Sequence, residues 1–152
     1  MKDSQLDIQV KYFKDLSLEE LYAILQLRAD VFVIEQDCIY QDIDGKDEQA
    51  LHILGYHGDQ LVAYTRCFAP HIYFEEAAIG RVVVEKSQRK FGFGHAILKA
   101  SVKAIEDQYK TKKIKLSAQQ YLVKFYESHQ FNQLGEGYLE DGIPHIAMLK
   151  NE

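Results

Sequence analysis

The sequence predicts an α/β protein with a mixed, mostly antiparallel central sheet and helices on both faces. Segments with the pattern of β-strands outnumber those with the pattern of helices, and helices are expected after the first strand, the central strand and a short strand near residue 114. Gly58-Asp59 and Asp141-Gly142 each separate two strand-like segments, which predicts two hairpins and therefore antiparallel pairs. We expect a single domain over residues 1–152.

Composition and charge exclude several classes of protein. The chain has 152 residues, of which 47% are apolar, enough for the core of one domain. Its net charge of −5 argues against a nucleic acid or an anionic membrane as a partner. No apolar run approaches the roughly 18 residues of a membrane span, and the first residues lack a signal-peptide core. We therefore expect a cytoplasmic protein.

The sequence gives no sign of a metal site. Cys38 and Cys67 are far apart and lack the spacing of metal ligands, so reduced thiols are expected. The loop around Asp42, Asp44 and Asp47 is acidic, but its spacing differs from that of a calcium-binding EF-hand loop. We expect this loop to shape the pocket of a cationic substrate, and a merely solvated loop is the alternative.

The N-terminal part is expected to form a strand and then a helix. Residues 6–13 alternate between apolar and polar side chains, as in a half-buried strand. Ser17 and Glu20 have the spacing of a capping box, which places the start of the helix at residue 18. Apolar residues at three- and four-residue steps predict its buried face: Leu18, Leu21, Tyr22, Leu25, Ala29 and Phe32.

Two arginines lie within apolar segments, Arg28 in the first expected helix and Arg81 in the central expected strand. A buried charge is costly unless it pairs with an opposite charge. We expect Arg81 to pair with Glu35 or Asp42 as a structural bridge, and such pairing would compete with a functional role for those carboxylates.

The rest of the chain alternates strands with two helices. The expected elements are strands at 51–57 and 61–68, a central strand from about residue 78, a helix after Gly94, a strand at 114–119, a helix at 121–129 and hairpin strands at 137–140 and 143–149. Pro70 is expected to end the second of these strands, because proline cannot donate a ladder hydrogen bond.

The most informative segment joins a buried strand to a loop with two glycines and a helix. Val82, Val83 and Val84 favour an extended, buried backbone. The free N–H groups of the helix start and the helix dipole form an anion pocket that suits a diphosphate, and glycines let it come close. The residues around this first turn are Arg89, Lys90, Phe91, Gly92, Phe93, Gly94 and His95. The alternative is an ordinary tight turn with solvated charges.

Two blocks resemble the GNAT-type N-acetyltransferases. Arg89-x-x-Gly92-x-Gly94 after a valine-rich strand is similar to their acyl-CoA pyrophosphate loop. Residues 116–131 resemble their later strand and helix, although Gln130 stands where the family has glycine. Two further segments, at 31–45 and 140–146, resemble the ElaA-like branch of the family, and the first is faintly similar to acyl-homoserine-lactone synthases.

The resemblance implies the GNAT fold with acetyl-CoA as co-substrate. In that fold the central strand splays from the strand at 114–119, so that pantetheine pairs with it as an extra strand. A main-chain N–H near Val82 would then stabilise the developing oxyanion. The implied acetyl-CoA contacts are Val82, Val83, Val84, Arg89, Lys90, Phe91, Gly92, Phe93, Gly94, His95 and Gln119.

The implied reaction is direct acetyl transfer to a primary amine, on a small molecule or a peptide, in a ternary complex. It needs a neutral amine, an oxyanion donor and a proton for the departing thiolate. Tyr126 matches the tyrosine that supplies this proton in many family members, and a core tyrosine is the structural alternative. Candidates for the base are His145, Glu35, His52 and water.

Other functions remain open at this point. A CoA-binding or regulatory protein without turnover would need the same loop, and chemistry like that of the acyl-homoserine-lactone synthases would use a different acyl donor. Neither cysteine has an adjacent base in the sequence, so a covalent cysteine intermediate is not expected. The protein could be a monomer or a homodimer.

Overall fold

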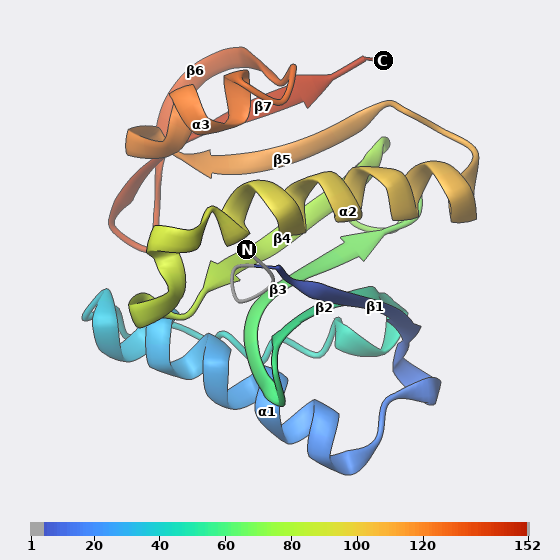
Figure 1. The fold of residues 1–152 in the computed structure, drawn as a ribbon. Coiled ribbons are helices and arrows are strands. Elements are labelled where there is room, and N and C mark those ends of the chain that lie inside the picture. The colour runs from blue at the N-terminus through green and yellow to red at the C-terminus, as the bar shows by residue number, and fades with distance from the viewer. Residues whose placement is uncertain (1–4, 152) are drawn as a thin grey trace.

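Seven strands form one sheet in the computed structural model, which describes residues 5–151 (Figure 1). They are β1 (Asp7–Tyr12), β2 (Leu51–His57), β3 (Gln60–Phe68), β4 (Ala77–Val84), β5 (Ile114–Gln119), β6 (Asn132–Glu140) and β7 (Ile143–Lys150). Their order in the sheet is β1-β2-β3-β4-β5-β7-β6, and only β4 and β5 run parallel. The predicted mixed, mostly antiparallel sheet is thereby confirmed.

Helices cover both faces of this sheet, as predicted (Figure 1). On one face lies α1 (Leu18–Arg28), whose Ile24 and Leu27 pack with Tyr64 and Val83 of the sheet. On the other face lie α2 (Phe93–Tyr109) and the short α3 (Val123–Glu127), which share the larger apolar core. Over the described part of the chain, no helix has the length and apolar character needed to cross a membrane.

The first helix begins as predicted but turns a different face to the sheet. Ser17 Oγ accepts a hydrogen bond from the Glu20 N–H at 3.0 Å, and the Glu20 carboxylate accepts one from the Ser17 N–H at 2.8 Å. The predicted face was wrong, because Leu18 and Tyr22 are 83% and 74% exposed. Ile24, Leu27, Arg28 and Val31 are buried instead. Apolar residues occur on both sides of this helix, so their periodicity does not decide which side is buried.

The strands β4 and β5 touch at one end and then part. Their pairing is limited to Ala77 with Ile114 and Ala78 with Lys115. Beyond these pairs, the edge of β4 that faces β5 has no strand partner in the described chain. This separation is the splay that the family resemblance implies.

A bulge further distorts β4 on its other side. Tyr64 of β3 pairs with Val83 and Arg66 pairs with Gly80, so two residues of β4 oppose one of β3. One of the two, Arg81, has a φ of 51°, in the left-handed region that disfavours residues with a side chain. The bulge therefore lies in the part of β4 that borders the opening between the two strands.

Candidate active site

A cleft of ≈ 540 Å³ opens where β4 and β5 part. Ligand pockets are commonly in the range of about 300–1,000 Å³. Its walls are the end of the π-helical turn Ala29–Glu35 with the following loop, β4, the start of α2, β5 with α3, and the turn between β6 and β7. The cleft thus gathers residues from segments between Val31 and His145 that lie far apart in the sequence.

One end of the cleft is the start of α2. Gly92 occupies the N-cap position with a φ of 74°, and no side chain caps the helix there. A Cβ on Gly92 would meet no atom within 4 Å, so the main-chain N–H groups of this turn remain accessible to a ligand. A helix of 17 residues with an open first turn attracts an anion through its N–H groups and its dipole.

Most of the predicted acetyl-CoA contacts line this cleft. They are Val82, Val84, Arg89, Gly92, Gly94, His95 and Gln119. Four others do not line it. Val83 faces the α1 side of the sheet, and Phe93 is buried in the larger core. Lys90 lies over the ring of Phe91, with its Nζ 5.2 Å from the ring centroid. These four residues could offer a ligand only their main chain, unless their side chains move.

Arg89 and Glu35 form an ion pair across the anion end of the cleft. The guanidinium donates to both carboxylate oxygens, at 2.6 and 2.7 Å, and its Nε donates to the Val84 carbonyl at 3.1 Å. The hydrogen bonds from Arg89 outweigh burial and hold the pKa of Glu35 below its usual value. Glu35, one candidate for the base, is thus an ionised partner of Arg89. The expected alternative pairing of Glu35 with Arg81 is wrong.

Tyr126 points its ring into the core and also lines the cleft. The residue is 5% exposed and packs edge-on against Phe125 and Phe131, with ring centroids at 5.1 and 6.1 Å. Its hydroxyl has no hydrogen-bond partner among residues 5–151. Burial raises the pKa of Tyr126 well above its ordinary value, so the phenol stays protonated. The geometry thus presents a protonated, unpartnered hydroxyl beside the cleft.

The two histidine candidates for the base differ sharply. His52 lies outside the cleft, with Nδ1 2.5 Å from the Tyr64 hydroxyl and Nε2 2.9 Å from the Asp47 carbonyl. Burial lowers the pKa of His52, and both ring nitrogens are occupied, so its role is structural. His145 lines the cleft, and its Nε2 lies 3.6 Å from a carboxylate oxygen of Glu140. Glu140 was not among the predicted site residues.

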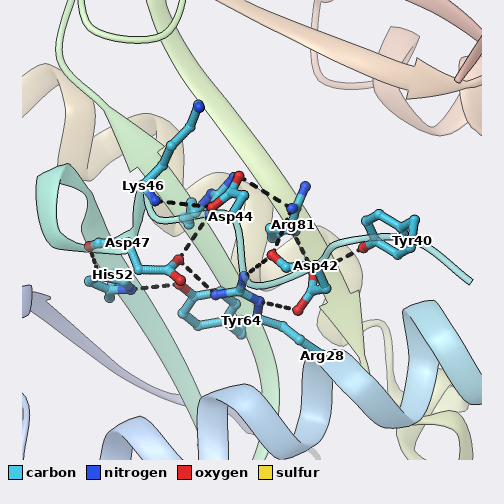
Figure 2. A network of polar contacts seen from close by, with 10 residues as sticks. Arg28, Tyr40, Asp42, Asp44, Lys46, Asp47, His52, Tyr64 and Arg81 are labelled. Carbon is cyan, nitrogen blue, oxygen red and sulfur yellow. Dashed lines mark hydrogen bonds and ion pairs between the residues drawn. The ribbon is translucent and has the colours of Figure 1, made fainter. Parts of the chain in front are cut away.

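The carboxylates of the acidic loop after α1 bind arginines of this chain, while the loop lines the cleft through Cys38 and Tyr40. Figure 2 shows Asp42, Asp44 and Asp47 facing guanidinium groups. Asp47 accepts from Arg28 at 2.7 Å and from Arg66 at 3.0 Å. The other ion pairs are Asp42 with Arg28 at 3.0 Å and with Arg81 at 2.7 Å, and Asp44 with Arg66 at 2.6 Å and with Arg81 at 3.4 Å.

This network fixes one wall of the cleft. Its arginines come from α1, β3 and the bulge of β4, so it ties the loop to the first helix and to two neighbouring strands (Figure 2). The Tyr40 hydroxyl donates to Asp42 at 2.9 Å, and Tyr40 itself lines the cleft. The expected bridge between Arg81 and Asp42 is confirmed. Among the described residues, no group of three or more His, Cys, Asp or Glu could hold a metal ion.

Two histidines that the sequence did not connect meet at the anion end. His95, in the first turn of α2, lies with Nδ1 2.8 Å from Nε2 of His129, which follows α3. Burial, together with neighbouring His95 and Lys99, lowers the pKa of His129. Their contact holds the end of α3, and with it Tyr126, against the start of α2.

Comparisons with known proteins agree with this geometry. A family model described as an acetyltransferase (GNAT) domain matches residues 14–152. ElaA of Escherichia coli is 41% identical over 147 residues, covering 95% of this chain and 96% of ElaA. Its crystal structure has a TM-score of 0.90 at 40% identity, covering 97% of this chain and 100% of that chain.

Two further solved structures share the fold. An acyl-CoA N-acyltransferase from Pseudomonas aeruginosa has a TM-score of 0.90 at 40% identity, covering 96% of this chain and 99% of that chain. An acetyltransferase of Bacillus subtilis, crystallised in complex with CoA, has a TM-score of 0.67 at 16% identity, covering 97% of this chain and 99% of that chain. At that identity, the second likeness concerns the fold alone.

Proposed function

The chain belongs to the GNAT acetyltransferase family, and from this premise we propose that it transfers an acetyl group from acetyl-CoA directly to a primary amine. The observation that carries the proposal is the cleft between β4 and β5, which has the open start of α2 at one end and the Tyr126 hydroxyl in its wall. A small molecule or a peptide could supply the amine.

The start of α2 is the proposed site of the CoA diphosphate. Main-chain N–H groups from Gly92 onward donate to its oxygens, and the helix dipole favours its negative charge. Arg89 adds a guanidinium at the same end of the cleft. The related fold of the CoA-bound Bacillus subtilis acetyltransferase supports a CoA ligand for this one.

The unpaired edge of β4 is the proposed site of the pantetheine arm. From Ile79 to Val84 this edge lacks a partner from β5, and an extended amide-containing chain can add to such an edge like a strand. The bulge at Arg81 changes the direction of the main chain at this point of β4. A main-chain N–H near Val82 then donates to the oxyanion that forms on the thioester carbonyl.

Tyr126 is the proposed acid. Its hydroxyl holds a proton at neutral pH and can pass it to a thiolate leaving group beside it. No residue needs to carry the acetyl group, since both substrates meet in one cleft. Holding them together supplies much of the rate, because effective molarities reach about 10⁵ M or more.

A thiol-release assay tests the proposed function. The purified chain is mixed with acetyl-CoA and a panel of amines that includes alkylamines, diamines, aromatic amines and short peptides, and free CoA thiol is followed. Thiol release that depends on both the amine and the protein supports the proposal. Tight binding of CoA without thiol release from any amine would instead favour a CoA-binding protein without turnover. A preference for long acyl chains would favour chemistry like that of the lactone synthases.

A further inference from the structure

We propose that His145 is the general base of this reaction and that Glu140 stabilises the imidazolium that forms when His145 takes the proton. The inference rests on the proposed function and names the group that takes the proton from the amine. It comes from three features at the β6–β7 end of the cleft. One is a histidine whose tautomer is fixed by a hydrogen bond, and another is a carboxylate beside the other ring nitrogen. The third is the hairpin, which places both side chains on the same face.

The hairpin places both side chains on one face. Asp141 and Gly142 form its two-residue turn with φ of 50° and 79°, values typical of the turns that suit the twist of a hairpin. Pairing from this turn sets Glu140 opposite Ile143 and Tyr138 opposite His145. Since alternate residues of a strand share a face, Glu140 and His145 lie on the same side, toward the cleft that both line.

The tautomer of His145 follows from its neighbour. Nδ1 lies 2.7 Å from the Ile143 carbonyl oxygen, which can only accept a hydrogen bond. Nδ1 therefore carries the proton in the neutral ring, and Nε2 carries the lone pair. A neutral histidine with its lone pair on Nε2 is a base, and its other nitrogen is already oriented by a hydrogen bond.

Glu140 lies where it favours the charged form of that ring. Its Oε2 is 3.6 Å from Nε2, and its Oε1 accepts from the Ser117 hydroxyl at 3.2 Å. When Nε2 takes a proton, the carboxylate stabilises the positive imidazolium. The Ser117 hydroxyl also bonds the hydroxyl of Tyr138, so the carboxylate and the tyrosine share an anchor on β5.

The ring of His145 has little freedom to move. Its side chain is 8% exposed, and Tyr138 stacks on it with ring centroids 6.2 Å apart. The Gln120 side chain donates to the His145 carbonyl at 3.1 Å, which joins β7 to the turn before α3. That turn leads directly to Tyr126, so the proposed base and the proposed acid are held by adjoining segments.

Other charged and titratable groups near His145 do not supply a competing base. Asp141 belongs to the adjacent turn, and its carbonyl accepts a bond from the Cys38 thiol at 3.5 Å. Across the cleft, Arg81 is paired with Asp42 and Asp44, and Tyr126 is a protonated phenol. Tyr138 is engaged with Ser117. Among residues 5–151, Glu140 is thus the one carboxylate within ion-pair distance of the free nitrogen of His145.

The amine nitrogen forms a bond to the thioester carbonyl carbon, and Nε2 of His145 accepts one proton from that nitrogen. The carbon–sulfur bond then breaks, and the thiolate takes the proton of the Tyr126 hydroxyl. The phenolate is reprotonated through solvent by the proton that His145 releases. The products are an amide and CoA with its free thiol.

The tautomer is tested without any acceptor. Long-range ¹H–¹⁵N spectra of the full chain, with His145→Gln used to assign the signals, report which ring nitrogen bears the proton at high pH. The proposal expects the proton on Nδ1. A proton on Nε2 would overturn it, because the nitrogen that faces Glu140 would then have no lone pair.

The role of Glu140 is tested by pH–rate profiles of Glu140→Gln, with 1,4-diaminobutane as the probe amine. Removing the charge takes away the group that stabilises the imidazolium formed in the step, so the plateau rate should fall while the affinity for acetyl-CoA stays unchanged. Glu140→Asp should restore part of the plateau. Glu136→Gln, the same change on an exposed residue of β6 outside the cleft, should leave the profile in place.

The outcomes separate this inference from the proposed function. If acetyl-CoA binds and thiol is released while the plateau rate of Glu140→Gln equals that of the parent, the base assignment fails and the acetyltransferase remains. If the parent chain neither binds acetyl-CoA nor releases thiol, the proposed function fails. The catalytic role of His145 then fails as well, even if the proton is found on Nδ1.

Discussion

Arg89 binds Glu35 through two hydrogen bonds, at 2.6 and 2.7 Å, and so joins the loop before α2 to the turn that follows α1. In the proposed function, the same guanidinium meets the diphosphate of CoA. A carboxylate and a phosphate oxygen make similar bonds to arginine. Under that proposal, Glu35 and the diphosphate compete for Arg89, and the ion pair is expected to weaken the binding of CoA.

Glu35→Gln is expected to tighten the binding of acetyl-CoA by about two- to fivefold, because the exposed pair it removes is worth about 0.2–1 kcal/mol. Calorimetry at low and moderate salt measures the change, which should shrink as salt screens the charges. Glu136→Gln, which removes an exposed carboxylate of β6 outside the cleft, is the matched control. Weaker binding in Glu35→Gln would show that the ion pair supports the site rather than competing for it.

Tyr126→Phe should lower turnover on the order of 100-fold while the affinity for acetyl-CoA stays unchanged. The hydroxyl has no partner among the described residues, so its removal should cost little stability. Tyr64→Phe is the matched control, because that buried hydroxyl bonds His52 at 2.5 Å and lies outside the cleft. It should lose about 1 kcal/mol of unfolding free energy and keep its turnover. Equal turnover in Tyr126→Phe and the parent at every pH would remove Tyr126 from the mechanism.

The arginine–aspartate network predicts how stability depends on pH. Burial alone would raise the pKa of Asp47, but hydrogen bonds and charge from Arg28 and Arg66 outweigh it and lower that pKa, and Arg66 likewise lowers the pKa of Asp44. A carboxyl group with a lowered folded pKa stabilises the fold fully above its unfolded value of about 3.9. That stabilisation is lost as the pH falls from there through the folded value.

Asp47→Asn should therefore lower the unfolding free energy at pH 7 by about 3 kcal/mol, because it leaves two buried guanidinium groups with less compensation. Its unfolding free energy should also change less than that of the parent as the pH is lowered below about 4. Denaturant titrations across this pH range measure both effects. Asp59→Asn, in the exposed hairpin turn between β2 and β3, should match the parent. Equal stability of Asp47→Asn and the parent at pH 7 would contradict the role assigned to the network.

Local patterns in the sequence were enough to predict much of the fold. The capping box at Ser17, the hairpins at Gly58-Asp59 and Asp141-Gly142 and the valine-rich strand depend on neighbouring residues, and all are present. Boundaries shifted, since β6 begins at Asn132 rather than near residue 137. Gln130 takes the left-handed φ of 66° that the family glycine would take, at a cost of about 1 kcal/mol.

Interactions between distant segments were not predictable in the same way. Arg28 and Arg66 pair with Asp44 and Asp47 of the acidic loop. The spacing of apolar and polar residues along the chain does not predict which charges pair across such distances in sequence. The same pairing explains why the aspartates of the acidic loop do not line the cleft. The sequence contained the hint that a buried arginine needs a partner, but it could not say which carboxylate was near enough.

The approach of Glu140 to His145 was missed for a related reason. The hairpin and its turn were predicted, yet the register that brings the two side chains together depends on the turn geometry. A count from Asp141-Gly142 would have set Tyr138 opposite His145 and Glu140 opposite Ile143. The register could therefore be predicted from the sequence once Asp141-Gly142 had been identified as a two-residue turn.

The binding of acetyl-CoA at the start of α2 is tested most directly by calorimetry on the parent chain, Gly92→Glu and Gly135→Glu. Both glycines have positive φ, 74° and 75°, and a Cβ at either meets no atom within 4 Å, so the two variants carry similar strain and the same charge. Gly135 lies on β6 outside the cleft. The parent and Gly135→Glu should bind acetyl-CoA, and Gly92→Glu should show no binding. Binding by Gly92→Glu as tight as that of the parent, or no binding by the parent at millimolar acetyl-CoA, would contradict the account.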